Sequence, residues 1–465
     1  MSANKFPQWF GSSGIRGSLE DISPKLCFDL GKAVALTLNS QNPVYIASDI
    51  RSTSSLLKTA FMSGYSSYSG VVIDIGLTTT PVLSYVSANY ETLGVMVTAS
   101  HNPPSDNGFK FFFNGRECVE DFERKIEEKL HLRVEKKNSP HPAVPWHRVG
   151  TISFKSNVRY IEEYLNLLSN KVEMGNIEYR IILDCANNVP SLVSPFMFQK
   201  LGFTGVITIN EEFDPLFTSR PSEPSPENLE LLIETVKEEK ADIGIAHDGD
   251  GDRFAIIDEK GNFVSSTSLI CFFLDNLRAI GSDRKKVVLT SDCTMQAFEI
   301  AKKKGVKVVT SPIGKLRIYA KNQEAYFLAE PYKLIFPEIG NWIDGIFPVL
   351  KLLEMSHMKK ISEQIKPYDK RKILRKAFRL PTKDRPRIKN LLNELPDIWE
   401  RKIKEVSTQD GIKIFFKDDS NLLIRFSGTE PKIKFYIESS LDSRNEKILK
   451  EIISVFGLPP PGFDC

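Results

Sequence analysis

Short apolar runs rich in valine and isoleucine recur along the chain, and stretches with helical periodicity separate them. The runs occupy residues 43–49, 70–76, 93–100, 180–187, 205–210, 241–248, 286–292, 306–314 and 325–331. Runs of this length that alternate with helices are typical of strands in parallel α/β units. The same order of elements occurs three times, although the residues themselves differ. The pattern therefore predicts three similar α/β domains with mixed, mostly parallel sheets.

The C-terminal part of the chain follows a different pattern. Residues 411–439 read as two strands around a polar turn at 418–421, followed by a loop and a further strand. A helix is predicted at 442–456, so this part is expected to be an α+β domain. Shifts in composition predict four domains, at 1–150, 151–260, 261–370 and 371–465.

The composition is that of an ordinary globular protein, with 41% hydrophobic and 26% charged residues among 465. A net charge of +3 is too small to indicate nucleic-acid binding. No apolar run reaches the ~18 residues that a membrane span needs, and the run at 268–277 is expected to be a buried helix. The six scattered cysteines and the lack of an apolar N-terminal signal predict a cytoplasmic protein with reduced thiols.

Each trio of apolar runs ends in unusual polar residues. The three ends carry Ser100, Asp248 and Glu330. In open α/β sheets, ligands bind outside the carboxyl ends of the strands. We therefore expect these three ends to face one shared cleft.

Three aspartates stand at alternating positions after the second trio, namely Asp248, Asp250 and Asp252. Carboxylates this dense repel one another unless they converge on a cation, and oxygen ligands of this kind suit Mg²⁺ or Ca²⁺. Gly249 and Gly251 leave the backbone free to wrap around such an ion. A solvated acidic turn is the alternative.

The segment 98–110 places Ser100 and His101 directly after a strand and Lys110 after a stiff, proline-containing bend. A serine nucleophile needs activation, and the G-x-S-x-G motif of serine hydrolases is absent. Beside a carboxylate cation site, phosphoryl transfer fits better. Ser100 would then carry a phosphoryl group, the cation would neutralise that group, and Lys110 would move protons. Taken alone, Ser100 would be a turn hydroxyl.

The loop that begins at Arg425 offers groups suited to phosphate. Arg425 presents a planar fork of donors, Ser427 and Thr429 present hydroxyls, and Gly428 lets backbone N–H groups approach an anion. The loop is therefore predicted to be a phosphate site. A plain turn between two strands is the alternative.

Taken together, these motifs resemble those of the α-D-phosphohexomutase family, which includes phosphoglucomutases, phosphomannomutases and phosphoglucosamine mutases. The resemblance rests on FGSSGIRG at 10–17, TASHNPPSDNGFK at 98–110, DGDGDR at 248–253 and RFSGTEP at 425–431, with PSEPSPENL at 221–229 also similar. The motifs span nearly the whole chain in the family's order. The resemblance implies four domains around a deep central cleft, in chain order a phosphoserine, a metal-binding, a sugar-binding and a phosphate-binding domain.

The resemblance also implies roles for individual residues. Ser100 would be phosphorylated in the active enzyme, and Lys110 would be the general acid/base. The ligands of a bound Mg²⁺ would be Ser100, Asp248, Asp250 and Asp252. The reacting centre would be completed by Arg16, His101, Lys110 and Arg253. The phosphate that is not reacting would be held by Arg425, Ser427, Gly428 and Thr429.

The loop at 328–338, LAEPYKLIFPE, departs from the family's sugar-contacting pattern G-E-x-S-G-H. Glu330 is kept, whereas Tyr332 and Lys333 stand where the serine and its neighbours would be. We predict that Glu330, Tyr332 and Lys333 bind the sugar. The alternative is that Tyr332 belongs to the core and Lys333 points to solvent.

The implied reaction interconverts hexose 1-phosphate and hexose 6-phosphate through a phosphoserine enzyme and a 1,6-bisphosphate that turns end for end. Glucose and/or mannose phosphates are the predicted substrates, with glucose 1,6-bisphosphate as activator. The alternatives are a phosphoglucosamine or phosphopentose mutase, or a phosphosugar-binding homologue that does not turn over. The expected partners are small-molecule sugar phosphates, without nucleic acid or membrane. The sequence does not indicate an oligomeric state.

Overall fold

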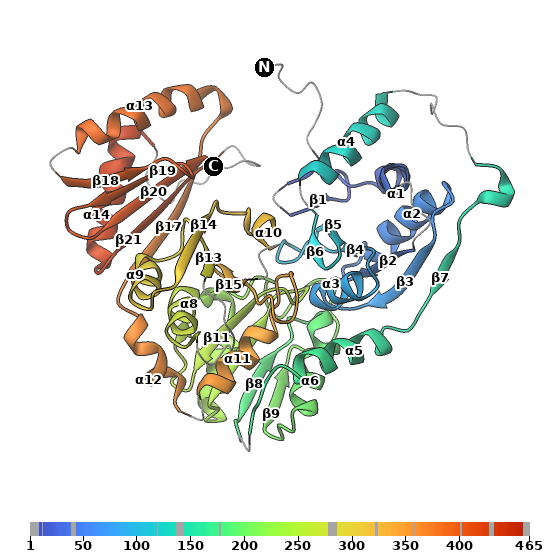
Figure 1. The fold of residues 1–465 in the computed structure, drawn as a ribbon, viewed down its shortest axis with the longest axis horizontal. Helices are drawn as coiled ribbons and strands as arrows, with labels where there is room; N and C mark the ends of the chain where they lie inside the picture. Colours follow the sequence, from blue (N-terminus) through green and yellow to red (C-terminus); the bar gives the residue numbers. More distant parts are fainter. Residues whose placement is uncertain are drawn as a thin grey trace.

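The computed structural model describes residues 9–11, 13–38, 43–118, 120–135, 144–175, 178–277, 286–320, 324–356, 359–399, 402–426 and 432–458. These residues form four β-sheets with helices packed against them (Figure 1). The chain passes from the first sheet, on the right of Figure 1, through the second and third to the fourth on the left. The predicted α/β class with a C-terminal α+β part is confirmed.

The first sheet has the strand order β1-β5-β4-β2-β3-β7, and β6 pairs with β5 outside this path. Its strands are β1 (Ile15–Ser18), β2 (Val44–Ser48), β3 (Val72–Leu77), β4 (Leu93–Val97), β5 (Asp106–Phe113), β6 (Arg116–Glu117) and β7 (Ile152–Phe154). β2, β3, β4 and β7 are parallel, whereas β5 is antiparallel to both β4 and β1.

Both faces of this sheet are covered, which explains why its strands read as continuous apolar runs. Val44 and Ile46 of β2 pack with α1 (Pro24–Leu38), α2 (Ser54–Ser66) and α4 (Glu120–Glu135). Tyr45 and Ala47, which point the other way, pack with α3 (Thr80–Asn89) and α5 (Val158–Ser169). Successive side chains of a strand alternate between faces, so one short run contributes to two cores.

The second and third sheets repeat this plan. The second has the order β12-β11-β10-β8-β9 and the third the order β14-β13-β15-β16. Their strands are β8 (Ile181–Asp184), β9 (Val206–Ile209), β10 (Ile243–His247), β11 (Phe254–Asp258), β12 (Phe263–Val264), β13 (Lys286–Thr290), β14 (Lys307–Ser311), β15 (Ala325–Glu330) and β16 (Lys333–Ile335). Their helices are α6 (Ser194–Lys200), α7 (Glu230–Glu238), α8 (Ser266–Asp275), α9 (Met295–Lys303), α10 (Leu316–Tyr319), α11 (Phe347–Ser356) and α12 (Ile361–Ile365).

The three sheets share one local feature, an antiparallel hairpin at the end of the third predicted run of each trio. The hairpins are β4–β5, β10–β11 and β15–β16. Ser100, Asp248 and the segment after Glu330 lie in their loops. Each trio therefore ends in the same local structure, whereas a cleft shared by all three ends stays a prediction.

The fourth sheet is antiparallel, with the order β17-β21-β20-β19-β18. Its elements are β17 (Lys372–Arg379), α13 (Arg385–Ile398), β18 (Ile403–Ser407), β19 (Ile412–Phe416), β20 (Asn421–Phe426), β21 (Lys432–Ser439) and α14 (Asp442–Phe456). The predicted turn at 418–421 and helix at 442–456 are confirmed. This sheet and its helices have a hydrophobic core of their own.

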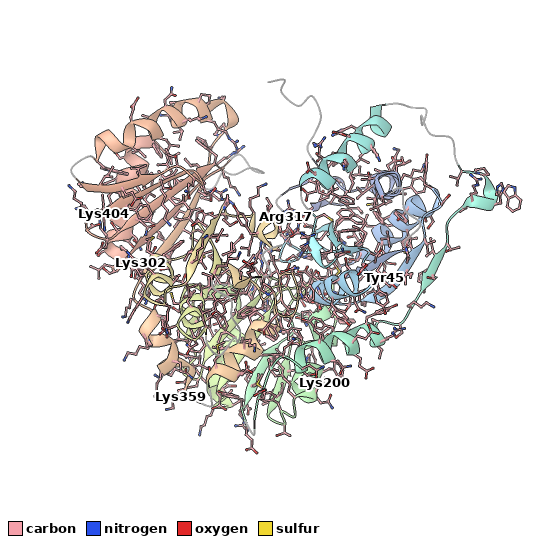
Figure 2. All side chains as sticks on the ribbon, viewed as in Figure 1. Tyr45, Lys200, Lys302, Arg317, Lys359 and Lys404 are labelled. Carbon is pink, nitrogen blue, oxygen red and sulfur yellow. The ribbon has the colours of Figure 1, made fainter. Side chains whose placement is uncertain are left out.

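The first three sheets are joined by a common hydrophobic core that includes residues of α3, α5, α8 and α11. Helix α8 is the buried helix predicted at 268–277, since residues 266–274 are all buried. A second connection crosses from α10 to α4, where Arg317 Nη1 donates to Glu123 Oε1 at 2.7 Å and to the Cys118 carbonyl at 2.8 Å. Arg317 is labelled near the centre of Figure 2. These contacts fix the first three hairpin loops relative to one another.

The domain boundaries near 150, 260 and 370 stay predictions. Two short strands, β7 and β12, lie just beyond the first two boundaries and pair with the preceding sheet. Five described cysteines, Cys27, Cys118, Cys185, Cys271 and Cys293, are free and buried. Within the described residues, no helix combines the length and the apolar character needed to cross a membrane.

Candidate functional site

Ser100 lies in the β4–β5 loop, with a side chain held against the β10–β11 loop. Its backbone is in the left-handed region, with φ of +54°, and the residue is only 1% exposed. The Ser100 amide donates to Thr98 Oγ1 at 2.8 Å, and Ser100 Oγ donates to Asp248 Oδ2 at 2.7 Å. The serine and the first aspartate of the predicted metal loop are thus in direct contact.

Arg51, a residue that was not predicted from the sequence, holds the loop that carries Ser100 through hydrogen bonds to its backbone. The Arg51 guanidinium donates to the carbonyl oxygens of Ser100 at 2.8 Å, Asn102 at 2.7 Å and Asp106 at 2.8 Å. Asp49 in turn accepts from Arg51 Nε at 3.1 Å. Both residues directly follow β2. Functional side chains therefore lie at the end of this strand as well.

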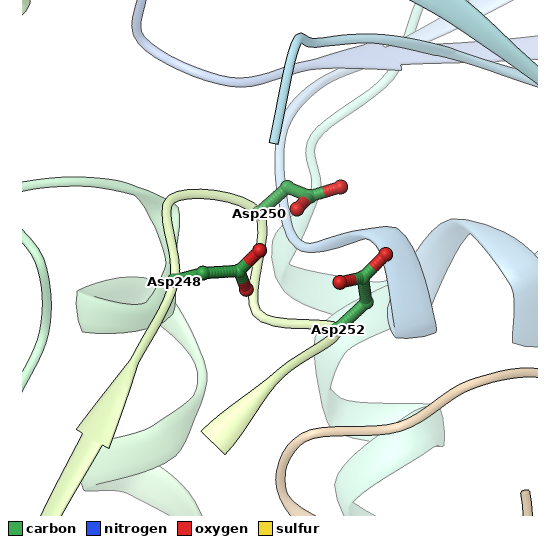
Figure 3. A group of neighbouring side chains, drawn as sticks. All are labelled: Asp248, Asp250 and Asp252. Atoms are coloured by element: carbon green, nitrogen blue, oxygen red, sulfur yellow. The ribbon is translucent and has the colours of Figure 1, made fainter. Parts of the chain in front are cut away.

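The three aspartates of the β10–β11 loop converge, as Figure 3 shows. One carboxylate oxygen of each lies within 4.8 Å of the others, and Asp248, Asp250 and Asp252 are 0%, 0% and 6% exposed. A Cβ atom at Gly249 would lie 2.7 Å from Ser222 Oγ and 3.0 Å from the Ser100 carbonyl. The glycine between the first two aspartates is therefore required by the close approach of the two loops.

The donor set fits a hard divalent cation. Asp250 Oδ1 and Asp252 Oδ1 are buried and have no hydrogen-bond partner in the described structure. Burial and the two neighbouring carboxylates raise the pKa of Asp248 well above its ordinary value. An ion bound by these oxygens would satisfy the unpartnered atoms and offset the repulsion.

Lys110 of β5 completes this arrangement. Its ammonium donates to Asp250 Oδ2 at 2.6 Å and to Asp252 Oδ2 at 2.7 Å. Burial disfavours the charged form of Lys110, but the two carboxylates outweigh burial and raise its pKa. Lys110 therefore places a positive charge beside Ser100 and the acidic triad.

Three further predicted residues lie around this centre. The Arg253 amide donates to Asp248 Oδ1 at 3.1 Å, and its guanidinium pairs with Glu223 Oε2 at 2.5 Å. His101 Nδ1 is 3.4 Å from Ser100 Oγ. Burial, Arg253 and Arg16 lower the pKa of His101 to about 2, so its imidazole is neutral at pH 7.

Two residues of the stretch 221–229 complete the shell around Ser100, a role that the sequence alone did not predict. Ser222 Oγ donates to the Ser100 carbonyl at 3.0 Å and accepts from the Gly249 amide at 2.9 Å. Glu223 is the partner of Arg253. Arg16 enters from β1, where it stands opposite Gly108 of β5.

The third hairpin presents Glu330, Tyr332 and Lys333 around a two-residue turn. Glu330 Oε2 accepts from the Gly314 amide at 3.0 Å, and Glu330 Oε1 is 3.5 Å from Lys333 Nζ. Tyr332 has φ of +67°, a left-handed conformation that a tyrosine rarely adopts. Tyr332 and Lys333 are both half-buried and line a cleft, so Tyr332 is not part of the core. Sugar binding by the two residues stays a prediction.

This cleft has a volume of about 500 Å³ and lies between the first, third and fourth sheets. Arg425 of β20 lines it together with Glu330, Tyr332 and Lys333. Arg425 Nε pairs with Asp410 Oδ1 at 2.8 Å, and Asp410 Oδ2 accepts from the Ile313 amide at 2.9 Å. Asp410 is thus a further residue that the sequence analysis missed.

The predicted site residues fall into two groups. One surrounds Ser100 and the acidic triad, and the other lines the cleft. The positive charge of Lys333 contributes to the lowered pKa of His101, so the two groups are within electrostatic range of one another. Ser427, Gly428 and Thr429 lie outside the described residues.

Known proteins match this chain along nearly its whole length. Residues 7–136, 159–261 and 377–455 match the domains described as phosphoglucomutase/phosphomannomutase alpha/beta/alpha domain I, alpha/beta/alpha domain II and C-terminal domain. A phosphopentomutase of Thermococcus kodakarensis is 33% identical over 449 residues, which cover 95% of this chain and 96% of the relative. A phosphoglucosamine mutase of Methanocaldococcus jannaschii is 33% identical over 461 residues, covering 96% of each chain.

A solved structure of a phosphoglucomutase/phosphomannomutase family protein from Burkholderia thailandensis has the same fold. It superimposes with a TM-score of 0.82 at 21% identity and covers 98% of both chains. The fold and these matches define an isomerase that moves a phosphoryl group within a sugar phosphate. The chain belongs to the phosphoglucomutase/phosphomannomutase family of the α-D-phosphohexomutase superfamily.

Proposed function

We propose that this protein is a sugar-phosphate mutase in which Ser100 carries the transferred phosphoryl group. The observation that supports this most directly is the 2.7 Å hydrogen bond from Ser100 Oγ to Asp248 Oδ2 in a buried centre that also contains Lys110. A serine that only capped a turn would not need three carboxylates and a buried lysine around it. The same set argues against a binding protein without turnover.

In the first half-reaction, a free hydroxyl of the sugar monophosphate attacks the phosphorus atom on Ser100. A new P–O bond to the sugar forms as the P–O bond to Ser100 breaks, and the proton of the hydroxyl is transferred to the serine oxygen with Lys110 as the acid/base. The product is a sugar bisphosphate. This intermediate then rotates end for end in the cleft, and its other phosphoryl group is transferred to Ser100 by the reverse steps.

We assign the cation to Mg²⁺, held by Asp248, Asp250 and Asp252, because these ligands are all hard oxygen donors. When bound, the ion neutralises charge on the phosphoryl oxygens. Arg253 and Arg16 supply further positive charge, and the Glu223 carboxylate orients the Arg253 guanidinium. Arg51 keeps the Ser100 loop in the conformation that presents the side chain to Asp248.

At the other end of the substrate, we assign Arg425 to the phosphate that is not reacting and Glu330 to the sugar hydroxyls. A carboxylate can accept from two neighbouring hydroxyls, and a guanidinium can hold two phosphate oxygens at once. Both residues line the same cleft. Tyr332 and Lys333 are assigned to the sugar and to its charged groups.

The identity of the sugar is the part of the proposal that the relatives change. Glucose and mannose phosphates were the predicted substrates, whereas the curated relatives are named phosphopentomutase and phosphoglucosamine mutase. These names support the alternative better. We therefore rank glucosamine and pentose phosphates ahead of glucose and mannose phosphates as substrates. We further propose a sugar bisphosphate such as glucose 1,6-bisphosphate as activator, and a cytoplasmic location for the enzyme.

The test is a set of coupled assays with the 1-phosphates of glucosamine, ribose, glucose and mannose, each with Mg²⁺ and a trace of the corresponding bisphosphate. We expect Mg²⁺-dependent conversion of at least one of these 1-phosphates to the 6-phosphate of the hexose or the 5-phosphate of ribose. Tight binding of the sugar phosphates without any turnover would instead support the binding homologue.

A further inference from the structure

Strand β7 is the outer edge of the first sheet, and the segment around it exposes several large apolar side chains. The exposed fractions are 87% for Trp146, 51% for Val149, 38% for Ile152, 72% for Phe154 and 65% for Val158. Of the fourteen large apolar side chains exposed among the described residues, these five fall within thirteen positions. Large apolar side chains exposed this close together in the sequence make the segment a candidate interaction surface, whereas single scattered ones need no explanation.

Ile152 and Phe154 point to one face of the sheet. In the parallel pairing of β3 with β7, Ile152 is opposite Val72 and Phe154 is opposite Asp74. Val72 belongs to the core that contains α1 and α2, and Asp74 Oδ1 accepts from Lys58 of α2 at 3.0 Å. The two exposed side chains therefore continue the α2 face of the sheet beyond the helix.

The backbone of β7 has hydrogen-bonding groups directed outward. The Thr151 carbonyl accepts from Val72, and the Lys155 amide donates to Asp74, both at 2.8 Å. Backbone groups alternate between the two sides of a strand. The N–H and C=O groups of Ile152 and Phe154 therefore point away from β3, toward the free edge of the sheet (Figure 1).

We propose that this edge is a homodimer interface, in which β7 pairs antiparallel with β7 of a second copy of the chain about a two-fold axis at Ser153. In this register, Ile152 of each copy stands opposite Phe154 of the other. The outward backbone groups of these residues then form about four hydrogen bonds across the axis. The two first sheets become one continuous sheet.

The apolar side chains are self-complementary in this register. Directly opposed residues point to the same face, so Ile152 and Phe154 of both copies form one apolar cluster on the α2 side. Lys155 stands opposite Thr151 of the second copy, and the two lysines are about 14 Å apart at the strand rise of about 3.4 Å. The pairing therefore opposes no like charges at close range.

The available area suits a second copy better than a short peptide. Exposed to 87% and 72%, Trp146 and Phe154 alone offer on the order of 300 Å² for burial. Ile152, Val149 and the strand itself add to this area, toward the ~800 Å² per partner of a stable interface. Closed two-fold pairing also removes an apolar edge strand that would otherwise promote aggregation.

The first experiment measures the mass of the purified full-length protein by light scattering at about 1 to 100 µM. We expect a dimer for the wild type and a monomer for the double variant Ile152→Lys/Phe154→Lys, with unchanged kcat/KM. Phe196→Lys is the matched control, since Phe196 is 51% exposed on α6. That variant should remain dimeric. A monomeric wild type, or a double variant that remains dimeric, would overturn the proposal.

A second experiment tests the register. The Cα atoms of a non-hydrogen-bonded antiparallel pair are about 4.5 Å apart, a distance that a disulfide can span. Ser153→Cys should therefore form an intermolecular disulfide on mild oxidation, and neither the wild type nor Phe196→Cys should do so under the same conditions. Cross-linking of Ser153→Cys no faster than that of Phe196→Cys would show that β7 does not pair in this way.

Discussion

The two ends of the proposed active site differ in how tightly the fold holds them. At the Ser100 end, Ser100, Asp248 and Lys110 are at most 1% exposed and are bonded to one another or to neighbouring loops at 2.6 to 2.8 Å. At the cleft end, Glu330, Lys333 and Arg425 line a volume of about 500 Å³. The ion pair between Glu330 and Lys333 is longer, at 3.5 Å.

This difference fits the separate roles proposed for the two ends, which are phosphoryl transfer at Ser100 and sugar binding in the cleft. Phosphoryl transfer depends on charges that are already in place when the transition state forms. A buried centre held by short hydrogen bonds provides such charges. In the proposed reaction the sugar binds in two orientations, so its contacts must be usable from both sides. We therefore expect changes at the Ser100 end to reduce turnover and changes at the cleft end to alter affinity and substrate choice.

The largest expected effect is that of Ser100→Ala, which removes the phosphoryl carrier. Turnover should fall by more than about 10³-fold, whereas sugar-phosphate affinity should change by less than about 10-fold because the cleft is untouched. Ser105→Ala, an exposed serine in the same loop, is the control and should behave as the wild type. Steady-state kinetics and calorimetric binding separate the two effects. A fully active Ser100→Ala enzyme would end the phosphoserine account.

The next effect is the loss of the cation. Chelation should abolish activity and Mg²⁺ should restore it, because the carboxylates need a cation to hold the phosphoryl group. Asp250→Asn removes one ligand charge and one of the two ion pairs of Lys110, so we expect kcat to fall by about 10²-fold or more. Asp242→Asn is the control, because Asp242 lies at the opposite end of β10 from the triad and accepts from the Arg180 amide. Full activity in excess chelator contradicts this assignment.

At the cleft end, Arg425→Ala should raise KM by about 10-fold or more, and Arg425→Lys should raise it less. The ammonium of lysine keeps part of the electrostatic attraction to the phosphate, but it cannot form the bidentate contact of a guanidinium. Arg444→Ala is matched to it, since Arg444 also pairs with an aspartate through Nε, at 2.7 Å, but does not line the cleft. If KM is unchanged in Arg425→Ala, the phosphate is held elsewhere.

Glu330→Ala should reduce kcat/KM for every accepted sugar by a similar factor, on the order of 10-fold, because in the proposed complex the carboxylate contacts hydroxyls that the sugars share. The measurement is the assay panel described above. A loss confined to one sugar would show that Glu330 selects the substrate and is not a common contact. That result would assign substrate choice at the cleft end to Glu330, and it would leave turnover assigned to the Ser100 end.

The smallest effect concerns Tyr332, whose φ of +67° is costly for a residue with a Cβ atom. Tyr332→Gly should relieve about 1 kcal/mol of backbone strain and raise the melting temperature, while weakening sugar binding. Tyr332→Phe keeps the strain and should leave the melting temperature unchanged. A glycine variant that is less stable than the wild type would indicate that the ring contributes more to packing than the conformation costs.

The sequence was most informative where function rests on contiguous residues. In the segments 98–110 and 248–253, Ser100 and the triad directly follow a strand, so their place at strand ends predicted them. Lys110, which lies within β5, was predicted from its place after the proline-containing bend. Arg51 was missed because its role lies in carbonyl contacts to another loop, which no short pattern encodes. Asp410 and Ser222 were missed for the same reason, since each acts across a distance set only by packing.

The sequence was less informative about the cleft end. Glu330 was found by its place after a strand, but its proximity to Arg425 depends on how the fourth sheet docks against the third. The substrate is harder still to infer, because it depends on a few contacts in a loop that departs from the family's pattern. The names of the relatives, and not any residue, moved the preferred sugars from glucose and mannose to glucosamine and pentose.

The most direct test of the account is the location of the phosphoryl group. The protein is incubated with glucose 1,6-bisphosphate and Mg²⁺, and the modified residue is identified by tandem mass spectrometry before and after a chase with the best sugar monophosphate. The account predicts one phosphoryl group, on Ser100, that the chase removes as sugar bisphosphate appears. An enzyme that turns over with its phosphoryl group on another residue, or with none at any time, would contradict it.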